Sequence, residues 1–294
     1  MTAARREPVV LLPDGLREHV LEAARQARAA GRPAPPAAEI SPVEAFRRAA
    51  DALDGLLCAL SEDDWRRPAL RGLDVQALIG HLIGVEDDVH RCLSGDPQVA
   101  RADHIESTQP AAARQAGRPA AQTRAEWRRA AERTIELVQA CGDMDAEVAV
   151  HGMRLPLGAL LIARAFELWT HDNDIRTAAG LPASVPDAST LTLMTGLAAR
   201  LLPHVAARTC PQTSVSVHLV LTGPGGGTWD IAIGQSSPEP PGICIITDTI
   251  GFCQLAANRI APADLELHVT GDQSHAPGVL AASVLAAASA LALD

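Results

Sequence analysis

The sequence predicts a two-domain α+β protein, in which a four-helix bundle is followed by a smaller α/β sandwich-type domain. Residues 42–180 contain four segments with apolar residues at helical spacing, and capping residues bound them. After Pro182 short alternating strand patterns appear between helical ones. The chain has 294 residues, which is long enough for two domains. We therefore expect an appendage and linker at 1–41, the bundle at 42–182 and an α+β domain at 183–294.

Composition narrows the function classes. The formal net charge of −10 disfavours nucleic acid as a partner. Six cysteines without a CxxC pair predict a reducing cytoplasm and no catalytic thiol. The apolar run at 276–293 is mostly alanine and lacks basic or aromatic flanks, so we expect a buried helix and no membrane contact. Oligomeric state is not readable from the sequence.

The first part of the chain is expected to be helical. Residues 15–30 are predicted to form a short helix in the appendage, capped by Asp14, before a proline-rich linker. Ser41 and Glu44 form a capping box for the first bundle helix. The remaining bundle predictions are a second helix from Val75 to about Leu93, an irregular connection over 94–121, a third helix from Thr123 to about Cys141, and a fourth over Leu157–Ala179.

The second part alternates between helices and strands. A helix over 185–202 precedes a hairpin of two strands, 214–221 and 228–233. We then expect a strand at 243–247, a helix at 248–259, a strand at 265–272 and the alanine-rich closing helix. The GPGGG turn between the first two strands lacks the strand and helix context of a phosphate-binding loop.

A candidate metal site lies in the bundle. Glu167 and His171 are four residues apart and so share one helical face, at the margin of the apolar stripe. His81 belongs to the apolar stripe of the second helix, where an imidazole needs a partner. A divalent metal would satisfy all three side chains. The alternative is an exposed helical pair and an ordinary core histidine.

Several nearby residues have weaker assignments. Asp174 is either an outer-shell partner that orients His171 or a solvated surface residue. Arg164 and Arg176 are expected on solvated faces, and His151 is a substrate contact or a loop residue. The remaining histidines show no ligand spacing: His90, His104, His204, His218, His268 and His275.

These motifs carry a resemblance. HLIGVED at the second helix and FELWTHDNDIR at the fourth resemble the mycothiol-dependent maleylpyruvate isomerase family, a DinB-like group of metal-binding bundles. The resemblance implies His81, Glu167 and His171 as metal ligands and Asp174 as the trailing acid. FCQLAANR and VTGDQSHAPGVL resemble the family's second domain, which is similar to sterol carrier proteins. An arginine there is thought to bind the substrate carboxylate, which implies Arg259, although Asn258 stands where the family usually has glycine.

The predicted function follows from an open coordination position. Three protein ligands are typical of a catalytic zinc, although iron, nickel and manganese stay open. The resemblance implies mycothiol as co-substrate, so we expect an isomerase or thiol S-transferase that acts on a small electrophile. Two alternatives remain: a non-catalytic metal-binding or regulatory protein that retains the bundle, and a metal-dependent hydrolase.

Overall fold

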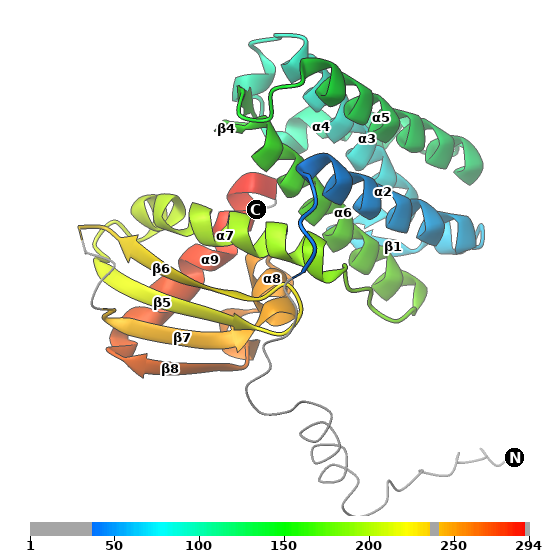
Figure 1. The fold of residues 1–294 in the computed structure, drawn as a ribbon. Coiled ribbons are helices and arrows are strands. Elements are labelled where there is room, and N and C mark those ends of the chain that lie inside the picture. Colours follow the sequence, from blue (N-terminus) through cyan, green and yellow to red (C-terminus); the bar gives the residue numbers. More distant parts are fainter. Residues whose placement is uncertain (1–36, 236–240, 292–294) are drawn as a thin grey trace, which may run out of the picture. The chain divides into compact units, whose positions relative to one another are not determined.

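The computed structural model describes residues 37–235 and 241–291, and the side chains up to residue 283. The predicted helix and most of the linker in the appendage lie outside these residues. Within them the protein is α+β, and the predicted fold class is confirmed (Figure 1). No helix in these two ranges is both long enough and apolar enough to cross a membrane.

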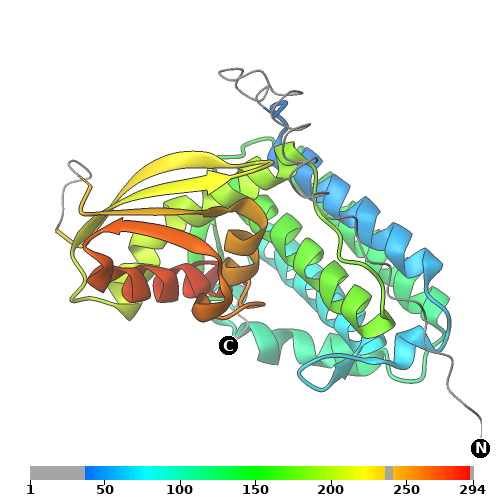
Figure 2. The ribbon, with the colours of Figure 1, turned by 90° about the horizontal axis from the view of Figure 1, so that it is seen from below.

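The first half is a bundle of long helices (Figure 2). Its core is aliphatic and contains few aromatic side chains, among them the fully buried Phe46 and Trp127. The helices are α2 (Pro42–Ala59), α3 (Val75–Leu93), α4 (His104–Arg114), α5 (Ala120–Cys141) and α6 (Leu157–Ala179).

Capping residues fix the bounds of the first two helices as predicted. Ser41 Oγ accepts a hydrogen bond from the Glu44 backbone N–H at 3.1 Å. Asp74 Oδ1 accepts one from the Ala77 N–H at 2.7 Å, so α3 begins at Val75. The third predicted helix begins earlier than expected, after Pro119, because Thr123 is buried and donates its hydroxyl to Gln115 instead of capping.

The irregular connection predicted over 94–121 is wrong, because it contains helix α4. Asp103 caps this helix by accepting from the Ile105 and Glu106 N–H groups, both at 2.9 Å. The buried face of α4 is formed by polar and small residues, so no apolar stripe marks it in the sequence. These buried residues are His104, Thr108, Ala111 and Ala112.

Two glycines of α3 bring α4 close to it. A Cβ at Gly80 would lie 2.7 Å from the Ala112 Cα, and a Cβ at Gly84 would lie 2.9 Å from the Thr108 Cα. Only glycine therefore permits this close approach of the two backbones. The approach places His104 and Thr108 beside His81.

Short strands connect the bundle helices. The polar stretch before α6 forms a hairpin, which the sequence did not predict. Its strands pair in register from Glu147↔Pro156 to Val150↔Met153. The short strands are β1 (Pro68–Leu70), β2 (Leu73–Asp74), β3 (Glu147–Val150) and β4 (Met153–Pro156).

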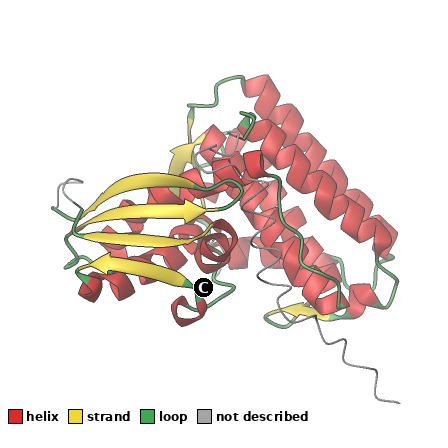
Figure 3. Ribbon diagram, turned by 60° about the horizontal axis from the view of Figure 1, so that its bottom comes forward, coloured by secondary structure: helices red, strands yellow, loops and turns green. Residues whose placement is uncertain are grey.

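The second half is a four-stranded sheet with helices packed on one face (Figure 3). The predicted hairpin is present, with β5 and β6 antiparallel, while β5 and β7 run parallel. The strand order is β6-β5-β7-β8. The elements are α7 (Ala188–Thr209), β5 (Val215–Thr222), β6 (Gly227–Ile233), β7 (Ile243–Asp248), α8 (Thr249–Ala256), β8 (Leu267–Gly271) and α9 (Ala276–Leu291).

The two halves share an apolar interface. Phe166 and Trp169 of α6 belong to the same buried cluster as Leu191 of α7 and Cys253 of α8. Helix α6 is therefore covered by bundle helices and also by the second half. Because nearly every residue from Leu157 to Asp172 is buried, the polar side chains of this stretch are removed from water.

Candidate metal centre

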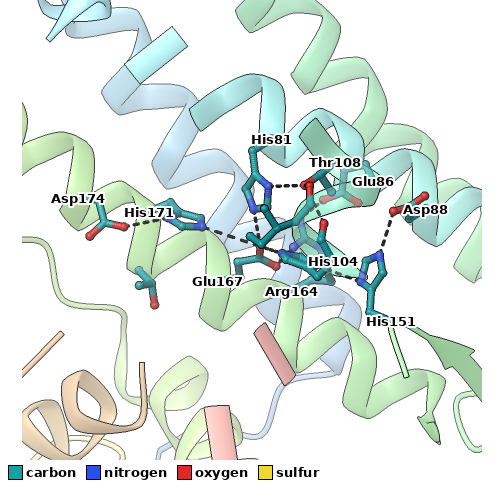
Figure 4. Close-up of polar contacts among 12 residues, drawn as sticks. His81, Glu86, Asp88, His104, Thr108, His151, Arg164, Glu167, His171 and Asp174 are labelled. Atoms are coloured by element: carbon teal, nitrogen blue, oxygen red, sulfur yellow. Dashed lines mark hydrogen bonds and ion pairs between the residues drawn. The ribbon is translucent and has the colours of Figure 1, made fainter. Parts of the chain in front are cut away.

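Three predicted ligands meet inside the bundle. His81 projects from α3, and Glu167 and His171 project from successive turns of α6 (Figure 4). One ligand atom from each lies within 4.8 Å of the others. His81 Nε2 is 3.4 Å and His171 Nε2 is 3.8 Å from Glu167 Oε1. The structure thus brings together residues 86 positions apart in the sequence.

All three side chains are buried. The exposed fractions are 4% for His81, 2% for Glu167 and 0% for His171. Glu167 and His171 are enclosed rather than marginal, because their face of α6 turns towards His81 of α3. The apolar stripe with Phe166 and Trp169 packs instead against the second half of the chain. A buried carboxylate is costly unless a cation or hydrogen-bond donors satisfy it.

Hydrogen bonds fix the tautomer of each ring. Thr108 donates its hydroxyl to the His104 carbonyl at 2.8 Å, so its oxygen accepts from His81 Nδ1–H at 2.8 Å. Asp174 Oδ2 accepts from His171 Nδ1–H at 2.8 Å. Each neutral ring then presents an unprotonated Nε2 towards Glu167 Oε1.

Burial keeps these rings neutral. It lowers the pKa of His81 well below its usual value, and the neighbouring His171 and Arg164 act in the same direction. Burial also lowers the pKa of His171, although the hydrogen bond to Asp174 opposes this effect. Neutral imidazole is the form that binds a metal.

The donor set fits a divalent cation. Two nitrogen lone pairs face one carboxylate oxygen without a proton between them, and His171 Nε2 has no hydrogen-bond partner among the described residues. A cation converts this repulsion between acceptors into attraction. Two imidazoles and a carboxylate are also a ligand set used by catalytic zinc.

Arg164 and Glu86 hold the other side of Glu167. Arg164 Nη1 donates to Glu167 Oε2, and Arg164 Nη2 donates to Glu86 Oε1 at 2.6 Å. Thr134 donates to the second Glu86 oxygen at 2.6 Å. One guanidinium between two carboxylates leaves a net negative charge, which Glu167 Oε1 presents to the cation site.

The expected solvated position of Arg164 is therefore wrong, since its side chain is buried. Sequence reasoning also missed Glu86, which is fully buried in α3. Arg164 lies three residues before Glu167 on the same helix, and this spacing was the available signal. Arg176 is half-buried and pairs with Asp172 at 2.6 Å.

Two further histidines lie beside the cluster. His104 Nε2 is 3.6 Å from Glu167 Oε1. His104 and His151 share a contact between their Nδ1 atoms at 3.1 Å, and His151 Nε2 donates to Asp88 Oδ2 at 2.9 Å. The sequence suggested a loop or substrate role for His151 and not its contact with His104. That contact arises because the β3–β4 turn, which carries His151, lies beside the start of α4.

The comparison with protein families bears on the bundle. Residues 46–176 match the family model of the mycothiol maleylpyruvate isomerase N-terminal domain. Residues 46–176 belong to this domain family. The resemblance inferred from the two helical motifs is confirmed, and the matched segment contains all three residues of the candidate centre.

Solved structures of the isomerase share the fold. The chain is similar to the crystal structure of the mycothiol-dependent maleylpyruvate isomerase, with 15% identity and a TM-score of 0.53. The match covers 77% of this chain and 91% of the isomerase chain. A mutant of that enzyme, in which a histidine is replaced by alanine, matches with the same values. No curated protein sequence matches at a significant level.

Arg259 lies outside the isomerase-family segment. Its guanidinium donates to both carboxylate oxygens of Asp174, at 2.8 and 2.7 Å, and to the Ala257 carbonyl at 2.9 Å. Asn258, which precedes it, has a φ of 56°, a left-handed conformation that asparagine adopts more readily than most residues. This conformation explains why asparagine can stand where the family usually has glycine. The role of Arg259 towards substrate stays a prediction.

Proposed function

We propose that the protein is a metal-dependent enzyme that activates a low-molecular-weight thiol of the mycothiol kind, for isomerisation of a small electrophile or addition to it. The observation that carries the proposal is the convergence of two imidazole Nε2 atoms on Glu167 Oε1, inside a domain of the isomerase family. Zinc is the metal we infer, because nitrogen and carboxylate donors in this combination suit it.

Each neighbouring side chain has a task in this proposal. His81, Glu167 and His171 hold the cation. Thr108 and Asp174 keep the Nδ1 protons in place, so that both Nε2 lone pairs point inwards. Arg164 occupies Glu167 Oε2 and leaves Oε1 for coordination.

A bound divalent cation would supply the electrostatic stabilisation that keeps a thiol ionised at neutral pH. The protein's own contribution is a dry, neutral-imidazole environment that holds the donors in fixed orientations. We place the electrophile next to the cation, where the thiol could add to it in either an isomerisation or a thiol transfer.

The experiment begins with elemental analysis of untagged protein purified without chelator. We expect about one equivalent of divalent metal per chain, and loss of that metal in Glu167→Ala. Turnover is then measured with mycothiol and maleylpyruvate, and with reactive haloalkanes. Thiol-dependent turnover supports the proposal, whereas metal-free wild-type protein, or full metal occupancy in Glu167→Ala, contradicts it.

A second candidate is a non-catalytic protein in which the metal stabilises the bundle. The complete burial of His171 and the near-complete burial of His81 and Glu167 favour this function, because a reactant needs access. Stoichiometric metal without thiol consumption across the substrate panel would support it. Metal-dependent turnover without thiol would instead indicate the hydrolase alternative.

A further inference from the structure

We propose that His104 is a further ligand of the metal, so that this chain offers three imidazoles and one carboxylate. The inference rests on the proposed metal centre and extends its ligand set. Two features carry it: the Nε2 of His104 points at Glu167, and a hydrogen bond at Nδ1 holds the ring.

The position of His104 matches that of the other rings. Its Nε2 lies 3.6 Å from Glu167 Oε1, between the 3.4 Å of His81 and the 3.8 Å of His171. Three imidazole nitrogens therefore lie within 3.8 Å of the same carboxylate oxygen, while His81, Glu167 and His171 form the set whose ligand atoms are all within 4.8 Å of one another. The His104 ring packs edge-on against the His81 ring, with centroids 4.9 Å apart (Figure 4).

The His104 Nε2 has no hydrogen-bond partner among the described residues, although the side chain is only 3% exposed. An unpartnered polar atom at this depth is costly and needs an explanation. The nitrogen points at a carboxylate that Arg164 already engages from the other side. A cation between them satisfies both groups.

A chain of hydrogen bonds sets the tautomer of His104. Asp88 is a carboxylate: burial opposes its ionisation, but hydrogen bonds from His151 and Ser107 outweigh that effect and lower its pKa. It therefore accepts from His151 Nε2–H at 2.9 Å. A His151 ring that carries its single proton at Nε2 has a free lone pair at Nδ1.

That lone pair accepts the proton of His104 Nδ1–H at 3.1 Å. The His104 Nε2 is left unprotonated and faces Glu167. Asp88, acting through His151, holds a proton on the outer nitrogen of His104, so that the inward nitrogen keeps its lone pair. Asp174 acts on His171 in the same way. We assign Asp88 and His151 as positioning residues.

A fourth protein ligand changes what the centre can do. Four protein donors complete the tetrahedral set of a structural zinc site, whereas three leave an open position. A centre that includes His104 admits a thiol only by a fifth coordination position or by release of His104. Helix α4 carries both His104 and the Thr108 partner of His81, so its placement controls the ligand number.

Zinc-loaded full-length protein allows a direct test by X-ray absorption at the zinc edge. We expect three imidazoles around the metal in the wild type and two in His104→Gln. Metal affinity, measured by competition with a chromophoric chelator, should fall by more than about tenfold in this variant. The matched control is His218→Gln, which removes a histidine of strand β5 that pairs with Asp230 at 2.6 Å. It should keep three imidazoles.

The positioning residues give a different result. Asp88→Asn should weaken zinc binding by about 10- to 100-fold while the imidazole number stays at three. Two imidazoles in the wild type would overturn the role of His104 and leave the proposed function intact. Absence of bound zinc would overturn both. The wild-type spectrum decides the matter even if His104→Gln does not fold.

Discussion

Arg259 and Asp174 form a two-point ion pair that joins the second half of the chain to the helix carrying the metal centre. The guanidinium nitrogens Nε and Nη2 lie 2.8 and 2.7 Å from the two carboxylate oxygens. The same carboxylate accepts from His171 Nδ1–H at 2.8 Å. Arg259, in the loop after α8, therefore helps to hold the carboxylate that orients His171 in α6.

We expect Asp174→Ala to lower metal affinity by about 10- to 100-fold, because His171 loses the acceptor that fixes its tautomer. Competition with a chelator of known affinity measures the effect. Asp230→Ala is the control, since Asp230 pairs with His218 at 2.6 Å on the exposed surface of the sheet. Equal affinity in wild type and Asp174→Ala would contradict the assigned role.

Arg259→Ala separates two roles of the arginine. The guanidinium is already engaged by Asp174 and by the Ala257 carbonyl, so we expect it to act on the metal centre through Asp174. The variant should lose metal affinity by less than Asp174→Ala, and the double variant should be no weaker than Asp174→Ala alone. A raised KM with unchanged metal affinity would instead support binding of a substrate carboxylate by Arg259.

The sequence predicted those elements whose information is local. Capping side chains fixed the start of α2 and α3, and glycine at 180 ended α6 in a left-handed conformation. Alternation identified the β5–β6 hairpin. The helical spacing of Glu167 and His171 indicated one shared face, the place of His81 in an apolar stripe suggested it as their partner, and the resemblance implied the same three ligands.

Other features could not be read because tertiary packing determines them. Helix α4 buries His104, Thr108 and two alanines, a face that has no apolar pattern. Gly80 and Gly84 mark the part of α3 against which α4 packs, but a search for apolar periodicity takes no account of glycines. Arg164 is buried because its guanidinium donates to Glu167 on the same helix and to Glu86 on α3. Sequence periodicity alone would place a charged residue in solvent.

We expect Gly84→Ala to destabilise the protein by about 1–3 kcal/mol, because the new methyl group would overlap the Thr108 backbone in a well-packed contact. The displaced α4 would carry Thr108 and His104 away from His81, so metal affinity should fall as well. Urea unfolding and chelator competition measure the two effects.

Gly55→Ala is the matched control for this substitution. Gly55 is also helical, but a Cβ there meets no atom within 4 Å. Alanine should therefore stabilise α2 by about 0.5–1 kcal/mol. If both variants gained stability, the close approach of α3 and α4 would not hold in solution.

The metal-free protein should lose stability in mild acid. Burial lowers the pKa of His104 from 6.5 to about 2, with the nearby His81 and His151 acting in the same direction. The pKa values of His81 and His171 are also lowered. The unfolded chain therefore binds more protons than the folded one below about pH 6.5. Each proton of difference reduces the free energy of unfolding by about 1.4 kcal/mol per pH unit.

Urea unfolding of chelator-treated protein between pH 7.5 and pH 5, a range that spans the unfolded-state pKa of about 6.5, measures this dependence. Stability should be flat above about pH 7 and fall progressively below about pH 6.5, before carboxylates begin to titrate. His104→Gln should reduce the slope, because it removes one of the buried rings. Metal at 1,000 times its dissociation constant should add about 4 kcal/mol at neutral pH, and this gain should shrink as protons compete for the ligands. A metal-free protein equally stable at pH 7 and pH 5 would show that these imidazoles are not held neutral by burial.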